Sequence, residues 1–372
     1  MPAPANLEES GFWLALAQVE GLGSAGAKKL IEHFGTPQAA FAAAEAELSE
    51  VPGLDRRALR GLLGFRAWER VQRELARVRE AQVTLVALNH PGYPPRLRQL
   101  PDAPPFLYVR GELRAEDERA VAVVGSRSAS PYGLKIAREL CRDLSALGFT
   151  IVSGLARGID GEAHAAALAA GGRTIAVLGS GVDVIYPGEH RALADRMAGG
   201  AGAVLSELRL GTRPLAHHFP ARNRIISGLA LGVVVVEATE RSGSLITARL
   251  AMDQGREVFA VPGQAGASRS RGTHQLIREG AKLVENVDDI LEEIAPQLRP
   301  SARAASARGA PVPEDLEEEQ RKIWQLIQLA PLQIDELIDA SGLSPARVSE
   351  ILLRLEIRGL ARQLPGKRFL AS

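Results

Sequence analysis

Short apolar runs alternate with amphipathic stretches through the middle of the chain. The runs lie at residues 120–126, 150–155, 173–179, 203–208, 232–238 and 257–263. Continuous apolar runs of this length are typical of strands that helices cover on both faces. The segments between them, such as residues 132–147, 159–170 and 243–255, have helical patterning. The alternation predicts an α/β, Rossmann-like fold with a doubly wound, mostly parallel sheet.

The flanking patterns divide the 372-residue chain further. Residues 1–82 predict an N-terminal domain of short helices, of the helix–hairpin–helix or SAM-like kind. Residues 83–295 form the extended Rossmann-like domain, with its core at residues 119–290 and a proline-rich lead-in that holds two short apolar runs. Residues 296–313 lack apolar periodicity and predict a linker. Residues 314–372 predict three helices and a final glycine-containing segment, the pattern of a winged helix.

Composition and charge narrow the class of protein. No apolar run approaches the roughly 18 residues that span a bilayer, and the single cysteine, Cys141, excludes an internal disulfide framework. We therefore expect a cytoplasmic protein with no membrane partner. Residues 119–289 hold 20 Lys and Arg against 16 Asp and Glu, whereas residues 312–372 hold 8 against 10. The central domain is thus the better electrostatic candidate for binding nucleic acid.

Small residues and arginines recur in the loops beside the predicted strands. Ligands of a doubly wound sheet bind beyond the carboxyl ends of its strands, and helix starts with hydroxyls and arginines suit phosphate. Four such loops suit an extended phosphate chain better than one small ligand, and Phe219 is either a stacking surface for bases or a core residue. The candidate nucleic-acid-binding residues are Gly125, Ser126, Arg127, Ser128, Ser153, Gly154, Arg157, Arg173, Phe219, Arg222, Asn223, Arg224, Ser242, Gly243 and Ser244.

The same loops disfavour cofactors and metals. A G-x-G-x-x-G fingerprint is absent, and no acidic residue ends the second strand, so NAD and FAD are not expected. Residues 21–28 nearly match a P-loop, but Ala27 replaces the required lysine. Metal ligation by Asp160, Glu162, His164 or the pair His217 and His218 has only weak support from spacing. We predict no cofactor, no metal and no catalytic residue.

The ordered motifs resemble those of the DprA/Smf family of DNA-processing proteins. They are GSRSASPYG, SGLARGIDGEAH, TIAVLGSGVDVIYP, FPARNRIISGLA and SGSLITARLAMDQGREVFAVPG, and the similarity covers residues 119–285. The resemblance implies a non-enzymatic protein that binds single-stranded DNA, forms a homodimer and loads the RecA recombinase during natural transformation, with single-strand-binding protein as a further partner. It also implies basic contacts to DNA from Arg127, Arg173, Arg222 and Arg224, although many relatives have lysine where Arg173 stands.

Two other functions remain open on the residues. A phosphoribohydrolase acting on nucleoside monophosphates shares the architecture, but its Pro-Gly-Gly-x-Gly-Thr loop is missing where residues 237–243 stand. A transcription regulator would use the winged helix, in which Arg347, Arg354 and Arg358 share one helix face. Because that domain is net acidic, protein docking or dimer packing is favoured there over duplex binding.

The N-terminal helices carry a further DNA-binding pattern. Gly21 and Gly23 resemble the hairpin of a helix–hairpin–helix motif, which presents backbone amides to phosphates. A second copy near Gly53 has Asp55 in place of its second glycine, which puts DNA contact there in doubt. A purely structural helical domain is the alternative.

Overall fold

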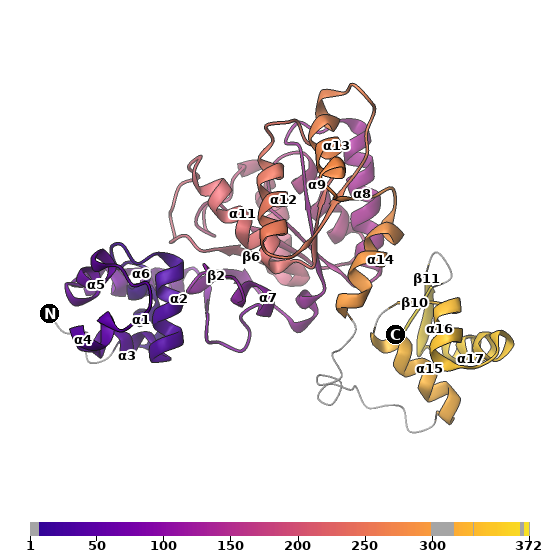
Figure 1. The fold of residues 1–372 in the computed structure, drawn as a ribbon, viewed down its shortest axis with the longest axis horizontal. Coiled ribbons are helices and arrows are strands. Elements are labelled where there is room, and N and C mark those ends of the chain that lie inside the picture. The colour runs from indigo at the N-terminus through magenta and orange to yellow at the C-terminus, as the bar shows by residue number, and fades with distance from the viewer. Residues whose placement is uncertain (1–6, 299–315, 330, 365–367, 372) are drawn as a thin grey trace. The chain divides into compact units, whose positions relative to one another are not determined.

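The computed structural model describes residues 7–298, 316–329, 331–364 and 368–371 (Figure 1). The chain forms two compact units, Met1–Val287 and Asp288–Ser372. No helix among the described residues is both long and apolar enough to cross a membrane. The predicted linker at residues 296–313 lies mostly outside the described residues.

The first unit begins with the predicted helical domain. Its helices are α1 (Glu9–Leu16), α2 (Gly23–Phe34), α3 (Pro37–Ala42), α4 (Glu45–Ser49), α5 (Arg56–Leu63) and α6 (Trp68–Glu80). Their buried side chains join one continuous apolar cluster with those of the sheet. Lys28 adds a polar link, since its ammonium group donates to the carbonyl oxygens of Arg98 at 2.9 Å and Leu100 at 2.7 Å.

A nine-stranded sheet forms the centre of the first unit, in the order β1-β2-β6-β5-β4-β3-β7-β8-β9. All pairs from β6 to β9 are parallel, whereas β1 and β2 add an antiparallel edge. The strands are β1 (Thr84–Ala87), β2 (Phe106–Gly111), β3 (Ala120–Val124), β4 (Thr150–Ser153), β5 (Thr174–Val177), β6 (Gly202–Ser206), β7 (Gly232–Val235), β8 (Glu257–Ala260) and β9 (Lys282–Leu283). The predicted fold class and all six predicted strands are confirmed. The two apolar runs of the lead-in form β1 and β2, which had not been predicted as strands, and the two-residue β9 was missed.

Helices cover both faces of this sheet. The pair α8 (Pro131–Ala146) and α9 (Ile159–Ala169) packs together, as does the pair α11 (His218–Leu229) and α12 (Gly243–Asp253). Burial on both faces explains why β3, β4, β5 and β7 consist of fully buried, mostly apolar residues. The remaining helices of the unit are α7 (Pro95–Arg98), α10 (Arg191–Arg196) and α13 (Arg271–Arg278), with short helical turns at Ala115–Glu118, Gly188–His190, Met197–Ala201 and Ser268–Ser270.

The order in which the chain adds strands to the sheet changes direction between β3 and β7, although these two strands are parallel. From β3 the chain moves through β4 and β5 to β6, then returns to β7 on the other side of β3. Crevices outside the carboxyl ends of strands at such a switch point are the usual ligand sites of this architecture. The loops after β3 and β7 therefore lie where a ligand is expected.

The second unit has its own core. It contains α14 (Val287–Leu298, from Asp288 on), α15 (Glu318–Leu329), α16 (Ile334–Ser341) and α17 (Pro345–Ile357). A three-stranded sheet completes it, in the order β10 (Leu332–Gln333), β12 (Arg368–Ala371) and β11 (Ala361–Leu364). Ile323, Leu337 and Ile351 are among its buried apolar residues. The winged-helix prediction is confirmed.

Candidate nucleic-acid interface

A cavity of about 710 Å³ opens beside the switch point. The loop after β3, the first half of α11, the start of α12 and the segment after β8 line it. Ten of the predicted binding residues are brought together here: Gly125, Ser126, Arg127, Ser128, Phe219, Arg222, Asn223, Ser242, Gly243 and Ser244. Segments more than a hundred residues apart in sequence thus form one wall, as the doubly wound topology requires. We call this cavity the switch-point pocket.

Arg127 and Phe219 form the cationic and aromatic part of the pocket. The exposed Arg127 places its guanidinium carbon 5.2 Å from the centre of the Phe219 ring. Phe219 is partly exposed, and its ring lies against Gly179, where an added Cβ would come within 3.0 Å of it. An arginine stacked on an aromatic ring offers one phosphate-binding fork and one apolar face for a base. Phe219 is therefore placed for stacking and is not a core residue.

Tyr186 extends this aromatic surface. Its ring centre lies 6.0 Å from that of Phe219, and about half of the residue is exposed. The sequence analysis missed Tyr186, because its nearness to Phe219 arises only in the folded chain. A row of aromatic rings provides stacking that tolerates any base.

The start of α12 supplies hydroxyl and amide groups to the pocket. Ser242 caps the helix, and its hydroxyl oxygen accepts a hydrogen bond from the backbone nitrogen of Ser244 at 3.4 Å. The Asn223 amide donates to the carbonyl oxygen of Gly243 at 3.4 Å and so joins α11 to this turn. The positive end of the helix dipole thus lies at the pocket wall, where it favours an anion.

Arg222 lies beneath the pocket. It is 5% exposed, and its guanidinium donates to the carbonyl oxygens of Gly154, at 3.0 Å, and Val177. Burial lowers the pKa of Arg222 to about 10, and the nearby Asp160 opposes that shift. Asp160 in turn accepts hydrogen bonds from the amides of Gly154 and Ala156, while burial raises its pKa. Arg222 therefore ties together the ends of β4 and β5 and forms part of the pocket floor.

The start of α8 is filled by a carboxylate of the chain itself. Glu237, at the end of β7, accepts hydrogen bonds from the backbone nitrogen of Ser130, at 2.9 Å, and from its hydroxyl. Ser130 also caps α8 by accepting from the amide of Gly133. The expectation that this helix start binds phosphate is corrected, because an anion already occupies it. The part of the loop that remains suited to phosphate is Gly125–Ser128, which precedes the start of α8 and lines the pocket.

Arg269 belongs to the pocket but was not predicted. It is exposed, lines the cavity, and donates from Nε to the carbonyl oxygen of Ser128 at 2.8 Å. Residues 268–272 read Ser-Arg-Ser-Arg-Gly and follow β8. This loop therefore has the same small residues and arginines as the predicted loops, so the signal for Arg269 was present in the sequence.

The candidate metal ligands do not converge. Among the described residues, no three His, Cys, Asp or Glu side chains are placed to share a metal ion. His164 is fully buried, with Nδ1 2.6 Å from the Thr174 hydroxyl. Burial lowers the pKa of His164 to about 3, so this imidazole is neutral and structural at pH 7.

Comparison with known proteins identifies the family. The model of the DNA recombination-mediator protein A family matches residues 84–295, more than half of the chain. The chain belongs to this family. A model of the DprA winged-helix domain matches residues 307–367, and one of a SAM-like helix–hairpin–helix tandem matches residues 14–63.

Relatives of the recombination-mediator family align over most of the chain. Protein Smf of Synechocystis is 35% identical over 97% of this chain and 98% of its own length, and Protein Smf of Escherichia coli is 41% identical over 87% and 86%. The crystal structure of DprA from Streptococcus pneumoniae matches with a TM-score of 0.68 and 37% identity, covering 77% of this chain and 99% of its own. A Helicobacter pylori DprA structure, reported for its single-stranded DNA binding mode, matches with a TM-score of 0.52 and 30% identity over 58% and 97%.

Not every predicted residue of this recombination-mediator chain reaches the pocket. Arg173 precedes β5, at the amino edge of the sheet, and pairs with Asp117 at 2.9 Å, which raises the pKa of Arg173. Arg224 is largely buried between Glu207 and Asp102, and Arg157 pairs with Glu189 at 2.8 Å. Ser153 is buried, with its hydroxyl donating to Val123, and Gly154 lies under the pocket beside Arg222. The roles of these residues in DNA binding stay predictions that the geometry does not support.

The helix–hairpin–helix part has one regular and one altered hairpin. Gly21 and Gly23 have φ values of +81° and +57°, which glycine adopts without strain. In the second hairpin Asp55 caps α5, since its carboxylate accepts from the amide of Ala58 at 2.7 Å. The departure from glycine at Asp55 therefore has a local structural reason.

Two arginines predicted on one face of the winged helix, Arg347 and Arg354, form ion pairs with carboxylates of the same domain. Arg347 contacts the carboxylates of Glu317, Glu319 and Glu350 at 3.7, 2.6 and 2.9 Å. Arg354 pairs with Glu350 at 2.7 Å. The predicted cationic face is thus largely neutralised within the domain.

Proposed function

We propose that this recombination-mediator protein binds single-stranded DNA in the switch-point pocket. The observation that carries the proposal is the stacking of Arg127 on Phe219 at the carboxyl edge of the sheet. Bases of a single strand are free to stack on Phe219 and Tyr186, whereas bases of a duplex are already stacked and paired. Arg127, Arg269 and the start of α12 hold the phosphates between them. The single-stranded DNA binding mode reported for the Helicobacter relative supports the same substrate.

A selectivity measurement tests this proposal. Fluorescence anisotropy is recorded with a labelled single strand, the matching duplex and the matching RNA at fixed salt. The single DNA strand is expected to bind most tightly, because the pocket needs unpaired bases. Equal or tighter binding of the duplex would contradict the proposal and favour a regulator that uses its winged helix.

We further propose that the protein acts without catalysis. If the chain were a phosphoribohydrolase, Glu237 would be its candidate catalytic glutamate. The Glu237 carboxylate accepts hydrogen bonds from the backbone nitrogen and the hydroxyl of Ser130. A carboxylate held in this way has a structural role at the start of α8. This arrangement supports a binding protein over a nucleotide hydrolase.

Recombinase loading is the second part of the proposal. We infer that a homodimer presents bound single-stranded DNA to RecA and displaces single-strand-binding protein, in keeping with the description of the family as recombination mediators. The experiment measures how fast RecA fills a strand coated with single-strand-binding protein. Substoichiometric amounts of this protein are expected to shorten the lag, and an unchanged lag would contradict the loading role.

A further inference from the structure

One exposed face of α6 in the helical domain is cationic. Arg70, Arg73 and Arg77 are three and four residues apart, so they lie on the same side of the helix. All three are exposed, while Val71 and Val78 on the other side are buried. Within the described part of the chain, neither Arg70 nor Arg73 makes an ion pair. Their charges are therefore available to an external anion.

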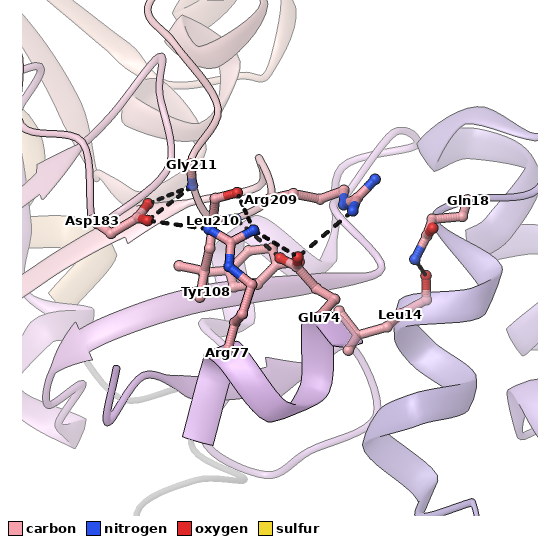
Figure 2. A network of polar contacts seen from close by, with 9 residues as sticks. All are labelled: Leu14, Gln18, Glu74, Arg77, Tyr108, Asp183, Arg209, Leu210 and Gly211. Atoms are coloured by element: carbon pink, nitrogen blue, oxygen red, sulfur yellow. Dashed lines mark hydrogen bonds and ion pairs between the residues drawn. The ribbon is translucent and has the colours of Figure 1, made fainter. Parts of the chain in front are cut away.

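A buried carboxylate joins this face to the α/β domain (Figure 2). Glu74 is 1% exposed and accepts hydrogen bonds from the Tyr108 hydroxyl at 3.1 Å and the Leu210 amide at 3.0 Å. The same carboxylate contacts Arg77 at 3.5 Å and Arg209 at 3.6 Å. The side chains of these two arginines remain 47% and 34% exposed. Glu74 thus fixes two arginines at the joint between the domains, and Asp183 contacts Arg77 at 3.7 Å as well. The two carboxylates balance the two guanidinium groups, which remain partly exposed and able to donate to a phosphate, so the unpaired positive charge comes from Arg70 and Arg73.

The loop at residues 209–213 connects this joint to the switch-point pocket. The amide of Gly181 donates to the carbonyl oxygen of Thr212 at 3.0 Å, and Gly179 lies against the Phe219 ring. Two residues of chain span at most about 7 Å, so the loop passes close to the stacking surface. Arg213 follows Thr212, is exposed, and makes no ion pair with any described residue. Asp183, in the segment after β5, contacts this loop: its carboxylate accepts from the Gly211 amide and pairs with Arg77 at 3.7 Å.

We propose that these arginines form a track that carries single-stranded DNA from the pocket onto the helical domain. The arginine track comprises Arg213, Arg209, Arg77, Arg73 and Arg70. The inference rests on the proposed function, since the occupant is the strand that leaves the pocket. Guanidinium groups are matched to phosphate oxygens, so contacts to the backbone alone would give binding without sequence preference.

Oligonucleotide length tests the track, because a short strand fills the pocket alone. The variant Arg70→Ala/Arg73→Ala removes two charges that make no intramolecular ion pair, so the fold is expected to persist. Its affinity for an oligothymidylate of about 5 nucleotides should match the wild type, and its affinity for one of about 30 should fall about tenfold. The slope of log affinity against log salt for the long strand should become shallower by about 1.4, at about 0.7 for each lost phosphate contact.

A matched variant controls for net charge. Arg196 and Arg278 are exposed and make no ion pair with a described residue, and they end helices at the amino edge of the sheet. Arg196→Ala/Arg278→Ala should bind both strands as the wild type does. If the wild-type protein binds neither the short nor the long strand, the proposed function itself is contradicted. Wild-type binding combined with an unchanged long-strand affinity in Arg70→Ala/Arg73→Ala would overturn the track alone, as would an equal loss on both lengths.

Discussion

The carboxylate of Glu237 accepts a hydrogen bond from the backbone nitrogen of Ser130, 2.9 Å away and 107 residues earlier in the chain. This contact fills the start of α8 with an internal anion, where many α/β proteins bind a phosphate. The neighbouring start of α12 lies at the wall of the switch-point pocket. The proposed DNA-binding site is therefore centred on Arg127, Phe219 and the start of α12.

Substitution of Glu237 should therefore affect stability. Glu237→Ala leaves the Ser130 amide without its partner, and we expect the free energy of unfolding to fall by about 1–3 kcal/mol. Glu237→Gln keeps an acceptor oxygen and should lose less. Chemical denaturation measures both, and chromatography of nucleoside monophosphates incubated with the wild type should show no free base. Base release that Glu237→Gln abolishes would establish an enzyme in place of a binding protein.

Arg269 should contribute to DNA binding although the sequence analysis passed over it. Arg269→Ala removes a cation at the pocket wall and a hydrogen bond to the Ser128 carbonyl, so single-strand affinity should fall by about 1.5–3 kcal/mol. Arg271→Ala is the matched control, because Arg271 lies two residues on, pairs with Glu240 and does not line the pocket. Titration by anisotropy compares the two. Similar losses from both variants would point to general charge in place of a defined contact.

His164 should make stability fall in acid. Burial holds its pKa at about 3 in the folded state, against about 6.5 in the unfolded state. The unfolded chain therefore takes up a proton that the folded chain refuses, so this stability is complete above pH 6.5 and is lost as the pH falls toward 3. Between pH 7.5 and 5 the loss should be about 2 kcal/mol.

Paired histidine variants isolate this effect. His164→Asn keeps a donor toward Thr174 and removes the titrating ring, so its stability should depend less on pH over that range. His33 is exposed, and His33→Asn should keep the wild-type dependence. Urea denaturation at each pH measures the differences. Identical pH dependence in wild type and His164→Asn would show that other groups dominate.

Removal of the winged helix should spare single-strand binding. A chain ending at Leu298 keeps the whole first unit with its continuous core. Because Arg347 and Arg354 are neutralised by carboxylates of their own domain, affinity should stay within about twofold, or 0.4 kcal/mol. A tenfold loss would show that these arginines leave their partners to contact DNA.

Much of the fold could be predicted from the local pattern of apolar and polar residues. The buried strands were recognisable because helices cover both faces of the sheet, which makes β3 and β7 continuously apolar. The two-residue β9 has no room for a pattern and depends on pairing with β8. The antiparallel placement of β2 beside β6 likewise depends on tertiary contacts.

The sequence indicated which loops form the candidate site, but it did not indicate which side chains contact one another there. Loop chemistry identified Arg127 and Ser242, since the topology fixes which loops converge. It could not show that Arg173 and Arg224 pair with Asp117 and Glu207 away from the pocket, because these contacts arise only in the folded chain. Tyr186 was missed for the same reason, since its nearness to Phe219 arises only in the folded chain.

The most direct test of single-strand binding at the switch-point pocket compares Arg127→Ala with Phe219→Ala at several salt concentrations. Each change should weaken oligonucleotide binding, by about 1.5–3 kcal/mol for the arginine and about 1–3 kcal/mol for the ring. Arg127→Ala should also flatten the salt dependence by about 0.7, whereas Phe219→Ala should leave it unchanged. Wild-type affinity in both folded variants would contradict the account.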